Sequence, residues 1–280
     1  MVAVVVVAVA AVVALVVLPP GQAKTAAGRT SPPAPGPASV SVPEPSPAAV
    51  AALPAVRYDA VIGGLMPFTE VVTALVGRYQ LAQDAAVYGA DRRTPVAKFP
   101  AKDFLDEPST VVVVRSDGGW DLVLTPARVE LPSASGGSAP AQSAGWIRAS
   151  DLHRVANIDT KVVISVGAQT LTISAPGTAD VTYRVGVGTP STPTPTGVTG
   201  YLQQRYLDPS QGESVYPIQL TSLHATTKDE PYGGEDGGLI GIHYNQTTTG
   251  AVSHGCVRLT AEAIQAVNRL PLGTPVTMVK

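Results

Sequence analysis

The chain of 280 residues contains a single cysteine, Cys256, and two histidines precede it at short distances. His254 lies two residues before the cysteine and His243 lies thirteen residues before it. A thiol becomes an efficient nucleophile when a base lies within hydrogen-bond reach. A lone cysteine can also pack as a small apolar residue, so the surrounding residues must decide between the two interpretations. The spacing predicts acyl transfer by Cys256, with one of the two histidines as the base.

The residues beside Cys256 favour the nucleophile. In an extended segment, side chains two positions apart point the same way, so His254 and Arg258 share a face with the thiol. Gly255 permits a tight turn, and we expect the Gly255 and Cys256 amides to be donors for a developing oxyanion. Arg258 could bind a substrate carboxylate. His243 ends a predicted strand, and a returning loop could bring it opposite the thiol.

A zinc site is the competing chemistry. His243, His254 and Cys256 are all zinc ligand types. No fourth ligand follows at motif spacing, so we expect neither a metal nor a cofactor.

Composition excludes some classes of function. The net charge is −2, charged residues make up 14% of the chain, and Lys and Arg are scattered. A nucleic-acid surface needs a concentrated basic patch, so we expect no nucleic-acid partner. The hydrophobic fraction of 45% is sufficient for a sizeable core.

The N-terminal residues predict export. Residues 2–18 are apolar without interruption and end at Pro-Pro-Gly, so we expect residues 1–23 to be a signal peptide or an N-terminal anchor. Membrane contact would come only through this segment, if it stays uncleaved. Residues 24–55 are rich in Pro, Ala and Ser and predict an extended tether. The expected location is the cell wall or the outer face of the cytoplasmic membrane.

The middle of the chain predicts a small β domain. Residues 56–80 form a connecting segment with a short helix over 68–80, and residues 81–156 carry short strands. Ser116-Asp117-Gly118-Gly119 predicts a turn between two of them. The predicted strands are 86–88, 110–115, 120–124 and 145–152, with a polar loop at 131–143. This pattern resembles a bacterial SH3-like barrel acting as a spacer or packing partner, with His153 on its surface.

Residues 157–280 predict a β-rich C-terminal domain. A hairpin turns at Gly167-Ala168, and a helix runs from Ala261 to about Leu270, capped by Thr260. The loop-rich stretch 201–238 predicts a substrate groove with His224 on the surface. The remaining expected elements are strands at 161–166, 169–174, 181–187, 239–243 and 275–279, and a rigid Thr/Pro loop at 188–197.

The string Ser253-His254-Gly255-Cys256-Val257-Arg258, preceded by Ile242-His243, resembles the signature of the YkuD-type L,D-transpeptidase family. The resemblance covers roughly residues 159–280. It implies a mainly β fold, in which an SH3-like small barrel is followed by a β-sandwich-like catalytic domain of two packed sheets with one short C-terminal helix.

The resemblance also implies a peptidoglycan reaction. Cys256 would attack the carbonyl of the third residue of a stem tetrapeptide, release D-Ala, and pass the acyl group to an amine of a neighbouring stem as a 3→3 cross-link. His243 would be the proton acceptor and donor, with His254 as a pocket residue or alternative base and Ser253 as its support. Tyr244, Asn245 and Arg258 would contact substrate, the Gly255 backbone would line the oxyanion hole, and carbapenem-type β-lactams would inhibit.

Two features leave alternatives open. Tyr244 stands where the family usually has a small residue, and only nine residues separate His243 from Ser253. A non-catalytic or weakly active peptidoglycan-binding wall protein is one alternative. The other is a sortase-like cysteine transpeptidase, because the order His, Cys, Arg also fits that class.

Overall fold

The computed structural model describes residues 42–72, 74–233 and 236–280. The expected signal peptide or anchor and most of the expected tether, residues 1–41, lie outside the described residues. The end of the expected tether contains a short helix, α1 (Pro47–Ala51). Within the described ranges, no helix is both long and apolar enough to span a membrane.

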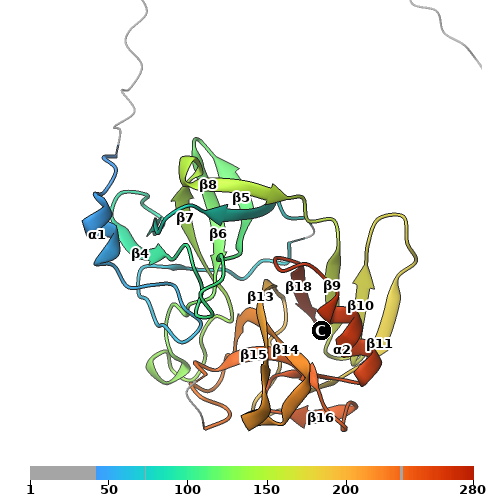
Figure 1. Cartoon of the computed structure of the whole chain (residues 1–280). Coiled ribbons are helices and arrows are strands. Elements are labelled where there is room, and N and C mark those ends of the chain that lie inside the picture. The colour runs from blue at the N-terminus through green and yellow to red at the C-terminus, as the bar shows by residue number, and fades with distance from the viewer. Residues whose placement is uncertain (1–41, 73, 234–235) are drawn as a thin grey trace, which may run out of the picture. The chain divides into compact units, whose positions relative to one another are not determined.

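The first half of the described chain forms one antiparallel sheet (Figure 1). Its hydrogen-bonded order is β4-β3-β7-β6-β5-β2-β8, and β1 pairs with β7. The Gly118-Gly119 turn predicted between β5 and β6 is confirmed, with both glycines at positive φ. The strands are β1 (Met66–Pro67), β2 (Gly77–Leu81), β3 (Ala85–Tyr88), β4 (Pro95–Phe99), β5 (Val111–Asp117), β6 (Trp120–Thr125), β7 (Ser143–Arg148) and β8 (Leu152–Ala156), with 3-10 turns η1 (Pro132–Ala134) and η2 (Ala149–Asp151).

The helix predicted over residues 68–80 is wrong. Residues 77–81 form β2 instead, which hydrogen-bonds to β5 on one side and β8 on the other. Pairing on both edges outweighs the helical spacing of a few valines and leucines, in a stretch that Gly77 already weakens as a helix. The sheet therefore begins before residue 81, and its identity as an SH3-like barrel stays a prediction.

The second half of the chain forms a ten-stranded sheet of order β11-β10-β9-β18-β13-β14-β15-β17-β12-β16, with one helix, α2 (Ala261–Asn268). The side chain of Thr260 caps α2 as predicted. The strands are β9 (Lys161–Ser165), β10 (Thr170–Ser174), β11 (Val181–Arg184), β12 (Gly186–Gly188), β13 (Val198–Asp208), β14 (Glu213–His224), β15 (Leu239–Tyr244), β16 (Gly250–Ser253), β17 (Val257–Leu259) and β18 (Pro275–Val279), with the 3-10 turn η3 (Pro209–Gln211) between β13 and β14.

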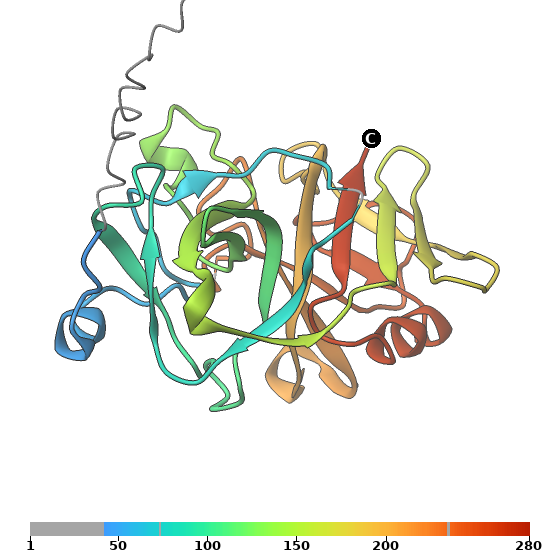
Figure 2. The ribbon, with the colours of Figure 1, turned by 90° about the horizontal axis from the view of Figure 1, so that it is seen from above.

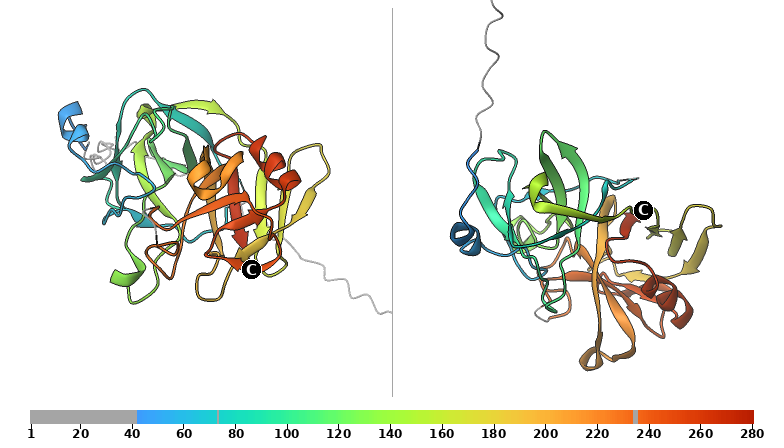
Figure 3. Two further views of the ribbon diagram at one scale, coloured as in Figure 1. Left: turned by 60° about the horizontal axis from the view of Figure 1, so that its bottom comes forward. Right: turned by 45° about the horizontal axis from the view of Figure 1, so that its top comes forward.

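The expectation that residues 201–238 are loop-rich is wrong for most of that stretch. β13 and β14 are the two longest strands described and form an antiparallel hairpin at the centre of the sheet (Figures 1 and 3). The sequence does not indicate these strands because they contain polar residues such as Gln219 and Thr221. Both are buried, and their side chains hydrogen-bond to Asn268 and to the Ile240 carbonyl.

Two smaller expectations also change. The β9–β10 turn spans residues 166–169, and Gln169 rather than Gly167 adopts positive φ. The predicted strand 181–187 is split at Val185 into β11 and β12, which pair with different partners.

A single apolar core is shared by the strands on either side of β13 in the ten-stranded sheet, which are called its two arms. β13 pairs with β18 through Val198–Tyr201 and with β14 through the rest of its length. Side chains from both arms meet with those of α2, and the buried residues include Ile164, Leu171, Leu202, Ile240, Ile242, Leu259, Ile264 and Met278. The mainly β fold with a single helix in this half of the chain is as predicted.

The two sheets lie against each other (Figure 2) and share core residues. Tyr201 of β13 is 1% exposed and packs among side chains of the first sheet, whereas Ala141 packs in the core of the second. Ser222 donates a hydrogen bond to the Gln142 side chain at 2.6 Å, and both residues are buried. Each sheet therefore covers apolar surface of the other.

We expect residues 157–280 to be markedly less stable alone than residues 42–280. Removing the first sheet exposes the Tyr201 side chain and other apolar surface that this sheet covers, which costs about 3–5 kcal/mol in total. Thermal denaturation should give a midpoint lower by about 10 °C or more. Equal midpoints for the two fragments would show that the sheets are independent.

Candidate active site

A cavity of about 650 Å³ lies over β14, β15 and the start of β17. The lining includes the predicted residues Cys256, His243, His254, Asn245, Arg258 and Ser253, together with Tyr58, Tyr206, Gln211, Glu213, Ile218, Leu220, Tyr232, Asp236, Leu239 and Gly241. The structure therefore brings most of the sequence-predicted site residues into one pocket.

Cys256 lies in the short connection between β16 and β17 and is 7% exposed. Its Sγ accepts a hydrogen bond from the Gly241 amide at 3.2 Å, and its carbonyl accepts one from Ser253 Oγ at 2.6 Å. Gly255 adopts a φ of 123°, and a Cβ there would lie 2.9 Å from Ile240 Cδ1. Only glycine fits this turn, which holds the thiol at the floor of the pocket.

The Thr/Pro-rich loop before β13 braces this turn. Thr194 Oγ1 donates to the Gly255 carbonyl at 2.7 Å and accepts from the Gly188 amide at 2.9 Å. The Thr189 amide donates to the Ser253 carbonyl at 3.0 Å. The loop that the sequence predicted as rigid therefore fixes the backbone on either side of His254.

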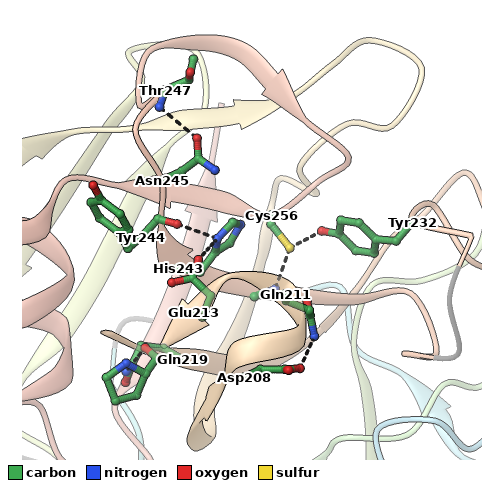
Figure 4. A network of polar contacts seen from close by, with 12 residues as sticks. Asp208, Gln211, Glu213, Gln219, Tyr232, His243, Tyr244, Asn245, Thr247 and Cys256 are labelled. Carbon is green, nitrogen blue, oxygen red and sulfur yellow. Dashed lines mark hydrogen bonds and ion pairs between the residues drawn. The ribbon is translucent and has the colours of Figure 1, made fainter. Parts of the chain in front are cut away.

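His243 reaches the pocket from β15. Parallel pairing places it opposite Arg258 of β17, two residues after Cys256. Its Nδ1 lies 3.0 Å from Glu213 Oε1 and 2.9 Å from the Tyr244 carbonyl, so Nε2 is the nitrogen left for the thiol (Figure 4). Burial disfavours the charged imidazole, but interactions with Cys256 and Glu213 outweigh burial and raise the pKa of His243 to about 9.

Tyr232 covers the thiol from the other side (Figure 4). Its hydroxyl contacts Cys256 Sγ, and its ring meets the ring of His254 edge-on at 5.6 Å. Burial and the neighbouring Cys256 raise the pKa of Tyr232, so the hydroxyl stays protonated. Tyr232 therefore covers part of the Cys256 Sγ surface that faces the cavity.

Two predicted roles need correction. The Gly255 amide donates to Ser253 Oγ at 3.1 Å and is not free for an oxyanion. The Tyr244 ring packs against the Tyr216 ring, with centroids 5.0 Å apart, and does not line the cavity as expected of a substrate contact. His254 keeps its expected place: it is exposed, lines the cavity and contacts the Tyr232 ring, while His243 is the better-placed base.

His224 was expected on the surface and is instead 1% exposed. Its Nε2 lies 2.9 Å from the carbonyl of Tyr58, the residue whose side chain lines the pocket from outside the C-terminal domain. Burial, together with the nearby Arg128, lowers the pKa of His224 to about 3, so the ring is neutral. His153 is exposed on β8 as predicted.

Sequence reasoning missed Glu213, Tyr232, Asp236 and Tyr58. Glu213 lies 30 residues before its partner His243, and no spacing rule links the two. Among residues 42–72, 74–233 and 236–280, no group of three or more His, Cys, Asp or Glu side chains is arranged to hold a metal ion. The zinc alternative therefore has no ligand set in this part of the chain.

Comparison with known proteins shows a similarity to one family over part of the chain. Residues 159–278 match the family model of the YkuD L,D-transpeptidase catalytic domain. The chain is similar to a putative L,D-transpeptidase YkuD of Bacillus subtilis (strain 168), with 30% identity over 118 residues. That match covers 42% of this chain and 64% of the relative, so the chain spans somewhat less than two thirds of the length of this curated relative.

Two solved structures are similar at lower identity. One is an L,D-transpeptidase (Yku) from Stackebrandtia nassauensis, with 18% identity, a TM-score of 0.32, and coverage of 44% of this chain and 56% of that one. The other is L,D-transpeptidase 3 from Mycobacterium tuberculosis in complex with a faropenem-derived adduct, with 15% identity, a TM-score of 0.34, and coverage of 76% and 99%.

The family match begins and ends at the limits of the ten-stranded sheet and contains both Cys256 and His243. Residues 159–278 of this chain are thus similar to the YkuD-type L,D-transpeptidase catalytic domain.

Proposed function

We propose that the protein is a peptidoglycan L,D-transpeptidase in which Cys256 forms the acyl-enzyme. The observation that carries the proposal is the pairing of a buried thiol with a histidine whose other ring nitrogen is already held. A nucleophile, a base and a group that orients the base are the parts that acyl transfer requires. The family of the catalytic domain supports peptidoglycan stem peptides as the substrate class.

The first half-reaction releases the terminal D-Ala of a stem tetrapeptide. Sγ attacks the carbonyl carbon of the third residue, and the Cys256 amide is the donor available for the developing oxyanion. His243 Nε2 then delivers its proton to the departing amide nitrogen, the C–N bond breaks, and a thioester remains on Cys256. The Gly241 N–H that points at Sγ stabilises negative charge on the sulfur.

The second half-reaction forms the cross-link. An amine of a neighbouring stem attacks the thioester carbonyl, His243 accepts the proton of that amine, and the thiolate leaves. Arg258 lines the same cavity and faces it from the position opposite His243, so it supplies positive charge for a stem carboxylate. Asn245 lines the cavity as well and is the other predicted contact that the geometry supports.

The proposed location follows from the proposed substrate. Peptidoglycan lies outside the cytoplasmic membrane, and the apolar residues 2–18 fit an export signal or anchor. The alternative of a non-catalytic wall-binding protein rested largely on Tyr244, and the ring of Tyr244 lies outside the pocket.

We expect a carbapenem to acylate wild-type protein once, at Cys256, because a strained β-lactam amide is an acyl donor for the same thiolate. Intact mass spectrometry should show a single adduct, which the Cys256→Ala variant should lack. The same variant should lose transfer between purified stem peptides by about 10³-fold or more while keeping its melting temperature. An adduct on Cys256→Ala, or unchanged transfer by it, would refute the nucleophile assignment.

We expect Tyr232→Ala to speed alkylation of Cys256 by iodoacetamide at least about threefold, because the variant removes the contact that covers Sγ. Rates are measured by mass spectrometry at one pH. Tyr206→Ala is the matched control, since Tyr206 lines the same cavity but packs against Phe104 rather than the thiol. Equal acceleration by both variants would mean that cavity size alone, and not Tyr232, controls access.

A further inference from the structure

We propose that Glu213 is a positioning residue of this site, whose buried carboxylate holds His243 as an imidazolium so that Cys256 rests as a thiolate. The inference deepens the proposed function and rests on it for the role of His243. Glu213 lies outside the Ser-His-Gly-Cys-Val-Arg motif and acts on the thiol only through the imidazole.

The carboxylate of Glu213 is buried and aimed at a single group. The residue is 6% exposed, and its Oε1 lies 3.0 Å from His243 Nδ1. Within the described residues, that ring is the only side chain with which Glu213 makes an ion pair or hydrogen bond. Burying an ionised carboxylate is costly unless a positive partner compensates it, so Glu213 and a protonated His243 stabilise each other.

The central hairpin delivers this carboxylate. Glu213 is the first residue of β14, directly after the turn that follows β13, and it pairs with Asp208. The same strand pairs further along with β15, which carries His243. The site is therefore built at three neighbouring strands. Glu213 lies on β14, His243 lies on β15, and Cys256 directly precedes β17.

Two acceptors share Nδ1, and they do different things. The Tyr244 carbonyl, at 2.9 Å, fixes the proton on Nδ1 and the plane of the ring. A neutral carbonyl stabilises the neutral and the protonated imidazole of His243 more equally than a carboxylate does. The negative charge of Glu213 selects the imidazolium, which in turn favours the thiolate across the ring.

The other charged and titratable groups around His243 do not replace Glu213. Arg258 faces it from β17 and opposes a second positive charge. Asp236, Tyr232 and His254 line the same cavity. Asp236 accepts a hydrogen bond from the Gly238 amide, and Tyr232 and His254 pair with each other. Cys256 and Glu213 are the groups whose interactions raise the pKa of His243.

The direct test is titration of the imidazoles by NMR, which is tractable because the chain has four histidines. In the wild type we expect His243 to titrate near pH 9. In Glu213→Gln, which keeps the size of the side chain but removes its charge, that value should fall by about one unit or more. Glu213→Asp keeps the charge one methylene further back and should fall between the two.

Asp236→Asn is the matched control, because it removes the other carboxylate of the cavity without touching the His243 ring. It should shift the His243 titration far less than Glu213→Gln does. A wild-type His243 that titrates near 6.5 would overturn the proposal without any variant, and so would equal shifts in the two variants.

The chemical readout is the rate of Cys256 alkylation as a function of pH. Loss of the imidazolium removes the positive charge beside Sγ, so Glu213→Gln should react about tenfold more slowly near pH 7, with a changed pH profile. A purely structural role would lower the melting temperature and leave the pH profile in place. These outcomes are separate from the proposed function: if Glu213→Gln behaves as wild type but Cys256 still takes the carbapenem, only the role of Glu213 fails.

Discussion

Negative charge that develops on a buried thiol must be compensated, and the second sheet places groups around the buried Cys256 that can compensate it. Strand β15 supplies two compensating groups in sequence, the Gly241 amide directed at Sγ and the His243 imidazole. The register of the parallel pairing between β15 and β17 sets the positions of these two groups along the strand relative to Cys256. A shift of one residue in that register would turn His243 into the core and Ile242 into the pocket.

The remaining elements keep this register from changing. Ile240 and Ile242 alternate with the site residues on β15 and are fully buried in the core shared with α2. The Thr/Pro loop holds the backbone of Ser253 and Gly255 from the opposite side. The turn that carries Cys256 is thus held between the packed core and the Pro-rich loop 188–197. This fixes the position of the thiol, which catalysis requires because small misplacements of a reacting group lower the rate.

The sequence predicted the local parts of this arrangement well. The Ser253–Arg258 string, the strand ending in His243, the capped helix α2 and the Gly118-Gly119 turn all have signals within a few residues. The central hairpin was not predicted, because its buried Gln and Thr residues are typical of loops when their hydrogen-bond partners are unknown. The burial of His224 and the approach of Glu213 to His243 are long-range contacts, which no spacing in a single sequence reveals.

The pocket also has a wall that the catalytic domain does not provide. The Tyr58 side chain lines the cavity, and its ring stacks edge-on with Phe104, which in turn meets Tyr206 of β13. Two of these three rings belong to the part of the chain upstream of the family match. A compound designed only against residues 159–278 would be fitted to a groove that is open on this side. Tyr58, supported by Phe104, is therefore a contact of this pocket that residues 159–278 alone do not supply.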